Sequence, residues 1–169
     1  MREMAKKYRD DRRGYTLVEL IVTILILGIV ASVMVVGISA ISGTKENACA
    51  ERLSRLLDQA RLETMSRVDG DVWLELCVRD GSYYGILRTA GEVRREVELG
   101  PQSLRMAVKN GENEVAVISS SASFSIRFSK GSGAFLFGSG YPAFTSVQIT
   151  GNRVREIVIY EETGRNSLT

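Results

Sequence analysis

A single carboxylate stands at the entrance of a long apolar segment. Glu19 is followed by Leu20–Ile41, which holds fourteen Leu, Ile and Val residues and no charged residue. This length matches the roughly 20 apolar residues that cross a bilayer. Insertion gains about 4–8 kcal/mol, and a buried carboxylate costs at most about 2.5–3.5 kcal/mol. Glu19 therefore does not prevent insertion, and an isolated acid in this place marks a function.

Other residue types that carry chemistry are scarce. The chain contains no His, so the commonest general base and metal ligand is missing. Its two cysteines are too few and too widely spaced for a zinc site. Asp69-Gly70-Asp71 is too short for a calcium loop and predicts a helix stop, and the glycine-rich stretch 131–140 lacks the Gly-Lys-Ser/Thr of a phosphate loop. We expect no enzyme, no cofactor and no metal.

The charge of the chain is concentrated before the apolar segment. Met1–Gly14 carries six basic and three acidic residues, out of 22 and 20 in the whole chain. The remainder holds 16 basic and 17 acidic residues, so overall attraction to DNA is not expected. The basic leader predicts a cytoplasmic N-terminus and a C-terminal domain outside the cytoplasm. Cys49 and Cys77 would then lie outside, where a disulfide and two separate buried thiols both stay open.

The stretch Arg13-Gly14-Tyr15-Thr16-Leu17-Val18-Glu19-Leu20, running into an apolar helix, resembles the processing site of type IV prepilins and pseudopilins. The resemblance implies cleavage by prepilin peptidase between Gly14 and Tyr15, followed by N-methylation of Tyr15. It also implies that Glu19 guides the subunit into a filament. Tyr15 stands where the family usually has Phe or Met. Val36 lies where major pilins carry Pro, which favours a minor subunit.

The resemblance places the protein in the cytoplasmic membrane as a single-pass precursor and then in a type IV pilus or type II secretion pseudopilus. Its implied partners are prepilin peptidase, other pilin or pseudopilin subunits, the assembly platform and, before assembly, membrane lipid. Two alternatives stay open: an unprocessed, signal-anchored surface domain and a DNA-binding minor pilin of a DNA-uptake pilus. For the second, Arg153, Arg155 and Arg165 are the candidate patch, with a solvated strand face as the other interpretation.

The rest of the chain predicts one helix and a sheet. After residues 15–44, the membrane or filament-core segment, residues 45–68 continue the helix as an amphipathic stretch that ends at Asp69-Gly70. Its apolar stripe comprises Cys49, Leu53, Leu56, Leu57 and Ala60. The i,i+4 pairs Glu51/Arg55 and Glu63/Arg67 occupy its other faces.

Residues 69–169 predict a β-rich domain. Alternating apolar positions and turn dipeptides such as Asp80-Gly81 and Asn110-Gly111 separate the expected strands. These strands are Val72–Val78, Tyr83–Thr89, Glu92–Leu99, Leu104–Val108, Glu114–Ser119, Phe124–Phe128, Ala134–Phe137, Phe144–Thr150 and Val154–Tyr160. The polar residues Glu161–Thr169 are expected to be loose.

The predicted fold class is therefore α+β: a long N-terminal helix, transmembrane in its first half and amphipathic in its second, packed on antiparallel sheets. This arrangement is similar to the GspH/FimT-type minor pseudopilins. Ala60-Arg61, Phe128 with Lys130-Gly131, and Thr163-Gly164-Arg165 are the residues that carry this finer resemblance. Gly164-Arg165 has the first Arg of the basic Gly-Arg-x-Arg pattern found in some FimT relatives and lacks the second.

Overall fold

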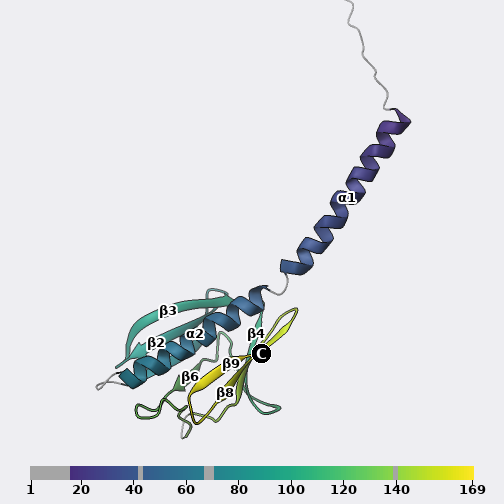
Figure 1. Cartoon of the computed structure of the whole chain (residues 1–169). Coiled ribbons are helices and arrows are strands. Elements are labelled where there is room, and N and C mark those ends of the chain that lie inside the picture. The colour runs from purple at the N-terminus through teal and green to yellow at the C-terminus, as the bar shows by residue number, and fades with distance from the viewer. Residues whose placement is uncertain (1–15, 42–43, 67–70, 139–140) are drawn as a thin grey trace, which may run out of the picture. The chain divides into compact units, whose positions relative to one another are not determined.

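The chain divides into two compact units. The computed structural model describes residues 16–41, 44–66, 71–138 and 141–169, and in the first helix it describes side chains as far as Val30. The units are Met1–Ala40 and Ile41–Thr169. Helix α1 (Leu17–Ile41) accounts for the described part of the first unit (Figure 1). Helix α2 (Thr44–Ser66) and all the described strands belong to the second.

Helix α2 is amphipathic and buries the predicted stripe. Cys49, Leu53, Leu56, Leu57 and Ala60 are at most 3% exposed. On its outer face Arg55 forms the expected ion pair with Glu51, at 3.0 Å. The second expected pair, Glu63/Arg67, and the expected helix stop at Asp69-Gly70 involve residues outside the described ranges. Residues 42–43, through which one continuous helix was expected to run, also lie outside them.

The second unit contains two antiparallel sheets. The strands are β1 Val72–Arg79, β2 Ser82–Thr89, β3 Glu92–Pro101, β4 Arg105–Asn110, β5 Asn113–Val117, β6 Phe124–Arg127, β7 Ser146–Thr150, β8 Val154–Tyr160 and β9 Arg165–Leu168. One sheet has the order β3-β2-β1-β6, and the other has the order β5-β4-β7-β8-β9. The α+β arrangement of helices and antiparallel sheets is confirmed.

The hairpin between β1 and β2 forms where the sequence predicts it. Asp80 and Gly81 have φ angles of 49° and 77°, which is the left-handed geometry of a tight two-residue turn. β4 and β5 pair in antiparallel register, and Asn110 pairs with Asn113, so the turn lies at Gly111-Glu112, one residue later than the predicted Asn110-Gly111. Most of the remaining expected strands appear with shifted ends, and β3 continues through Gly100 to Pro101.

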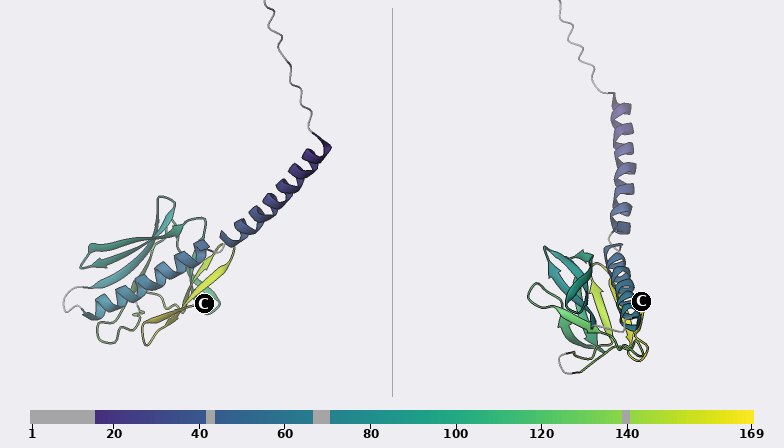
Figure 2. Two further views of the ribbon diagram at one scale, coloured as in Figure 1. Left: turned by 45° about the horizontal axis from the view of Figure 1, so that its top comes forward. Right: turned by 90° about the vertical axis from the view of Figure 1, so that its left-hand side faces the viewer.

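Helix α2 packs against strands of both sheets (Figure 2). Leu74 and Leu76 of β1, fully buried, lie in the same core cluster as the helix stripe. Gly85 of β2 allows this close approach, since a Cβ there would lie 2.3 Å from Leu56 Cδ2. Tyr83 joins the two sheets, because its buried hydroxyl donates to the Leu104 carbonyl at 3.0 Å. Burial raises the pKa of this tyrosine.

The phenylalanines of the chain form one cluster. Phe124, Phe128, Phe135, Phe137 and Phe144 have ring centroids 4.6–6.4 Å from their neighbours, mostly edge to face or tilted. This packing explains an error in the sequence prediction. Ala134–Phe137 forms no strand of its own and makes only an isolated bridge, because its rings anchor the segment in place of a strand ladder.

The last residues are ordered, contrary to expectation. β9 pairs with β8, and Asn166 faces α2, where its amide donates to Asp58 Oδ1 at 2.9 Å and accepts from Ser54 Oγ at 2.5 Å. Glycine makes the approach to β9 feasible: Gly164 has a φ of 63°, and a Cβ there would lie 1.6 Å from the Gly133 carbonyl oxygen. Residue propensity alone misses this strand because its stability comes from tertiary contacts.

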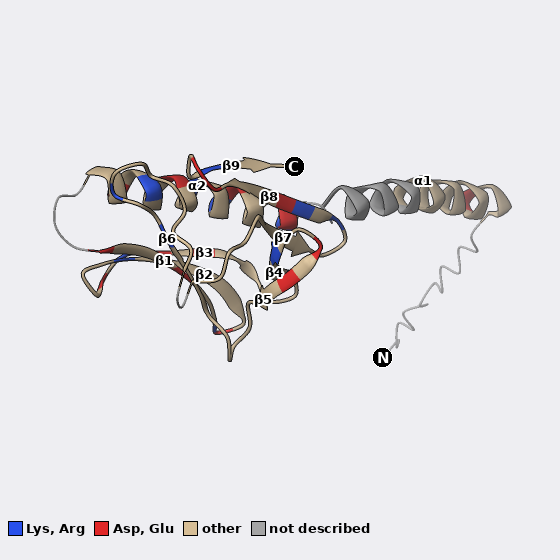
Figure 3. Ribbon diagram, turned by 90° about the horizontal axis from the view of Figure 1, so that it is seen from below, with Lys and Arg blue, Asp and Glu red and all other residues tan. Residues whose placement is uncertain are grey.

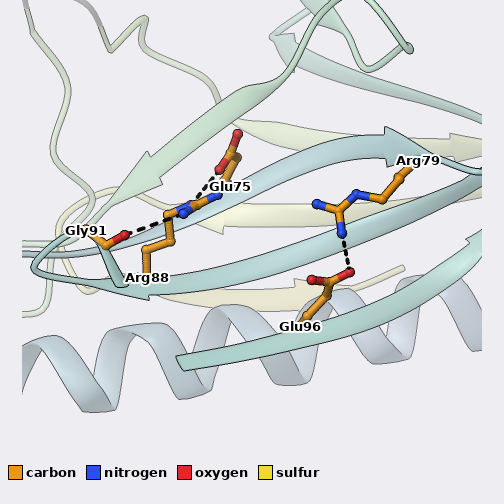
Figure 4. A network of polar contacts seen from close by, with 5 residues as sticks. All are labelled: Glu75, Arg79, Arg88, Gly91 and Glu96. Atoms are coloured by element: carbon orange, nitrogen blue, oxygen red, sulfur yellow. Dashed lines mark hydrogen bonds and ion pairs between the residues drawn. The ribbon is translucent and has the colours of Figure 1, made fainter. Parts of the chain in front are cut away.

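The face of the first sheet that points away from α2 carries matched charges (Figure 4). Arg88 Nε donates to Glu75 Oε2 at 2.9 Å, and Arg79 Nη1 donates to Glu96 Oε1 at the same distance. Arg88 also reaches the carbonyl of Gly91 at 3.5 Å. Each of these cross-strand arginines therefore has a carboxylate partner within its own sheet.

Candidate functional site

The described part of the chain begins two residues after the expected cleavage site. Gly14 and Tyr15, the two residues on either side of the expected scissile bond, lie outside the described residues. Thr16 follows directly and caps helix α1, since its hydroxyl accepts from the Glu19 backbone N–H at 3.2 Å. Thr16-Leu17-Val18-Glu19 has the spacing of a capping box, in which a hydroxyl residue and an acid three positions later mark the helix start. Helix α1 therefore begins at Leu17, with Thr16 as its capping residue.

Glu19 is exposed in the first turn of α1. An acid there is favoured by the partial positive charge of a helix N-terminus. Thr23, one turn later, donates its hydroxyl to the carbonyls of Glu19 and Leu20 at 2.9 Å each. The polar side chains at this end of α1 thus satisfy backbone groups, and within the described residues no basic side chain pairs with Glu19.

The described Leu, Ile and Val side chains of α1, from Leu17 to Val30, are all exposed, between 46% and 76%. The described part of the α1 ribbon carries an acidic position near its N-terminal end and is otherwise uncharged (Figure 3). Glu19 is the one charged residue along this helix. A helix that is apolar all round requires an apolar environment.

Among the residues that the structure describes, no helix is both long enough and apolar enough to cross a membrane.

The first turn of α2 holds a second acid with a different environment. Glu46 is 2% exposed, and its Oε1 accepts from the backbone N–H of Asn152 at 2.6 Å. Burial alone would raise the pKa of this carboxyl. Hydrogen bonds from the backbone N–H groups of Glu46 itself, Asn152 and Arg153, together with the Arg153 charge, outweigh burial and lower the pKa. Its carboxylate thus fixes the helix start to the turn between β7 and β8.

The structure does not bring the two cysteines together. Cys49 is fully buried on α2, whereas Cys77 is half-buried on β1, and both are free thiols. Strand alternation explains the separation: Leu74 and Leu76 point into the core cluster, so Cys77 points to the opposite face of the sheet. Burial raises the pKa of the Cys49 thiol to about 12, which makes it a poor nucleophile. In this structure the two thiols are free and behave as small side chains.

The three arginines considered for DNA do not form one surface. Arg155 on β8 donates to Asn47 Oδ1 of α2 at 2.5 Å and is half-buried. Arg165 pairs with Tyr160 at the other end of β8, and strand alternation puts it on the opposite face of the sheet. Arg153 is exposed beside the Glu46 carboxylate. The structure therefore offers no single basic patch made of these residues.

Two residues escaped the sequence analysis although signals were present. The capping role of Thr16 follows from the Thr-x-x-Glu spacing. Glu46 occupies the core-facing row of α2, three residues before Cys49 and seven before Leu53. An acid in line with the apolar stripe indicates a buried carboxylate.

Comparisons with known proteins identify the N-terminal segment alone. Neither curated proteins nor solved structures give a match to this chain. Residues 9–35 match the family model of the prokaryotic N-terminal methylation motif, a segment that includes Gly14, Tyr15 and Glu19. The chain thus carries the N-terminal motif of type IV pilin-like proteins, which implies processing by prepilin peptidase and assembly with other pilins.

Proposed function

We propose that this protein is a minor subunit of a type IV pilus or type II secretion pseudopilus, of the GspH/FimT type. Its role is assembly, with no catalytic step of its own. One observation carries the proposal: the matched methylation motif leads directly into a helix whose described aliphatic side chains are all exposed. Such a helix requires lipid before assembly and other helices after it.

In this proposal, prepilin peptidase cleaves after Gly14 and methylates the new amine of Tyr15. Thr16 caps the helix, so in the sequence the new amine of Tyr15 comes one residue before the cap. There a positive charge meets the positive end of the helix dipole, which is unfavourable without a nearby anion. Glu19 of a neighbouring subunit supplies that anion within an apolar bundle, where an unpaired carboxylate would also be costly. The pairing fixes the axial register of adjacent subunits.

The orientation and location follow from the same proposal. The basic leader stays in the cytoplasm, the apolar segment 15–44 anchors the precursor in the cytoplasmic membrane, and the domain lies outside. The domain then presents its loops to other subunits of the filament.

The experiment separates the two roles that Glu19 can have. Gln is accepted at the third position of a capping box, so Glu19→Gln keeps the helix start and removes the charge, whereas Glu19→Val removes both. We expect both variants to be cleaved and membrane-bound, and both to be lost from sheared filaments. Normal incorporation of the Gln variant alone would show that Glu19 acts as a capping residue.

Processing is tested by mass spectrometry of the protein from cells that make the filament. The expected N-terminus is Tyr15 bearing one methyl group, and Gly14→Leu should leave the full-length precursor. An intact N-terminus in the wild-type protein, together with its absence from every filament, would overturn the proposal in favour of a signal-anchored surface domain.

A further inference from the structure

A hollow lies between α2 and the edge strand β3. It has a volume of about 160 Å³ and is lined by Arg52, Arg55, Leu56, Gln59, Arg95 and Val97. Three guanidinium groups therefore surround one concave surface with an apolar floor. Like charges that converge in a concavity raise the local potential and favour an anionic occupant.

Two of these arginines have no carboxylate partner among the described residues. Arg55 pairs with Glu51, whereas Arg52 Nη1 donates to the carbonyl of Glu98 at 3.1 Å and Arg95 Nη1 donates to Gln59 Oε1 at 2.8 Å. These neutral acceptors hold the side chains in place and leave their charge uncompensated. The cross-strand arginines of Figure 4 differ, because each has its own carboxylate. Guanidinium groups bind carboxylates with paired, directional hydrogen bonds.

A complementary feature exists elsewhere on the same domain. Glu161 and Glu162 lie exposed in the turn between β8 and β9, and neither has a basic partner in the part of the chain that the structure describes. The turn is rigid: Gly164 N–H donates to the Tyr160 carbonyl at 2.9 Å, and Phe135 N–H donates to the Glu161 carbonyl at 3.0 Å. It therefore presents two carboxylates without a large cost in ordering the backbone.

The hollow and the turn lie on different sides of α2. Arg52 and Gln59 of α2 bond to β3, whereas Ser54 and Asp58 bond to β9, the strand that follows the acidic turn. Within one copy of the domain the acidic turn therefore does not contact the hollow. The turn of one copy can contact the hollow of a second copy placed beside it. Such a contact uses different surfaces on each copy, so it leaves both ends open for further copies.

We propose that the turn carrying Glu161 and Glu162 docks into the hollow between Arg52 and Arg95 of a second copy of this chain. The inference rests on the proposed filament function and deepens it. It makes copies of this subunit adjacent in the filament, in place of single copies dispersed among other subunits. Charge complementarity selects this partner, since each surface carries the charge that the other lacks.

The test is cysteine cross-linking in the full-length protein within cells that assemble the filament. Arg55→Cys marks the rim of the hollow and Thr163→Cys marks the turn, in a Cys77→Ser background that removes the partly exposed native thiol. A short bis-maleimide reagent should give a covalent homodimer. Reversing the hollow, with Arg52→Glu and Arg95→Glu, should lower the dimer yield about fivefold, because attraction becomes repulsion.

Charge exchange decides the identity of the partner. Reversing the turn alone, with Glu161→Arg and Glu162→Arg, should cause the same loss, and combining all four changes should restore the dimer to within about twofold of the starting yield. Failure of the combined variant to recover would overturn the second-copy assignment, and so would a dimer yield that neither reversal changes. Arg52→Gln with Arg95→Gln removes the two charges, together with the hydrogen bonds to the Glu98 carbonyl and to Gln59, without introducing repulsion, and should give an intermediate yield.

Matched controls lie on the same domain. Arg94 and Glu112 are exposed residues outside both surfaces, so Arg94→Glu and Glu112→Arg should leave the dimer yield unchanged. Recovery of the subunit in sheared filaments is measured in parallel. Wild-type protein that enters filaments without forming the dimer contradicts this inference alone, whereas wild-type protein absent from filaments contradicts the proposed function.

Discussion

The two helices of this protein begin alike but differ in how far their side chains are buried. Each has one acid in its first turn, Glu19 in α1 and Glu46 in α2. Glu46 is buried and held by backbone N–H groups of its own domain, whereas Glu19 is exposed. The side chains follow the same division, since α2 buries one stripe and α1 exposes aliphatic groups on all described faces. The domain buries the apolar stripe of α2, whereas the described apolar side chains of α1 are exposed.

Shortening one leucine on each helix should change the stability of the domain by very different amounts. Leu53 is fully buried, so Leu53→Ala should lower the free energy of unfolding of the domain by about 2–5 kcal/mol. Leu25 is 60% exposed, so Leu25→Ala should leave that free energy unchanged. Trp73 is the single tryptophan and lies in the domain, so its fluorescence during urea unfolding reports the difference in the full-length protein. Equal losses would contradict the difference in burial between the two leucines.

The two acids give the next largest contrast. Glu46→Gln should destabilise the domain by about 1–3 kcal/mol at neutral pH, because a neutral amide oxygen accepts weaker hydrogen bonds than a carboxylate and the new NH2 group would be buried without a partner. The pKa of Glu46 is lower in the folded protein than its ordinary value of 4.5, so its stabilisation is present above that value and lost as pH falls through the folded pKa.

Wild-type protein and the Gln variant should therefore converge in stability once the pH falls below the lowered pKa of folded Glu46, as followed by urea unfolding across the acid range. Glu19→Gln is the matched control and should shift neither the transition nor its pH dependence. A constant difference between wild type and Glu46→Gln at every pH would contradict the ionised state assigned to Glu46.

The smallest effect concerns a surface charge of α2. Glu51→Gln removes the i,i+4 pair with Arg55, whose side chains are 54% and 79% exposed. The expected loss is about 0.3–0.5 kcal/mol in low salt and less in high salt. A loss as large as that of Glu46→Gln would mean that any acid of α2 contributes equally, and that burial of Glu46 has no special role.

Patterns within short stretches predicted much of the fold. The stripe of α2, the turn at Asp80-Gly81 and the strands around it depend on neighbouring residues, so the sequence contains the necessary information. The motif around Glu19 was identified in the same way, and the family comparison supports it.

What local patterns missed depends on distant contacts. Arg165–Leu168 lacks β-branched residues, and it becomes strand β9 because Asn166 finds Ser54 and Asp58 over a hundred residues away. Ala134–Phe137 has strand-like residues, yet its rings join an aromatic cluster. Whether Cys49 and Cys77 lie close together depends on which face of β1 meets α2, and the local sequence does not encode this. Such features follow from tertiary packing, which no local period encodes.

The bonds between α2 and the rest of its domain have a mechanical consequence. Near its start the helix is tied to the β7–β8 turn through Glu46, in its middle to β3 through Arg52, and further along to β9 through Asp58. A force drawn along the helix axis would load these ties together as parallel shear. Because the ties share such a load, the domain stays folded while its N-terminal segment is pulled.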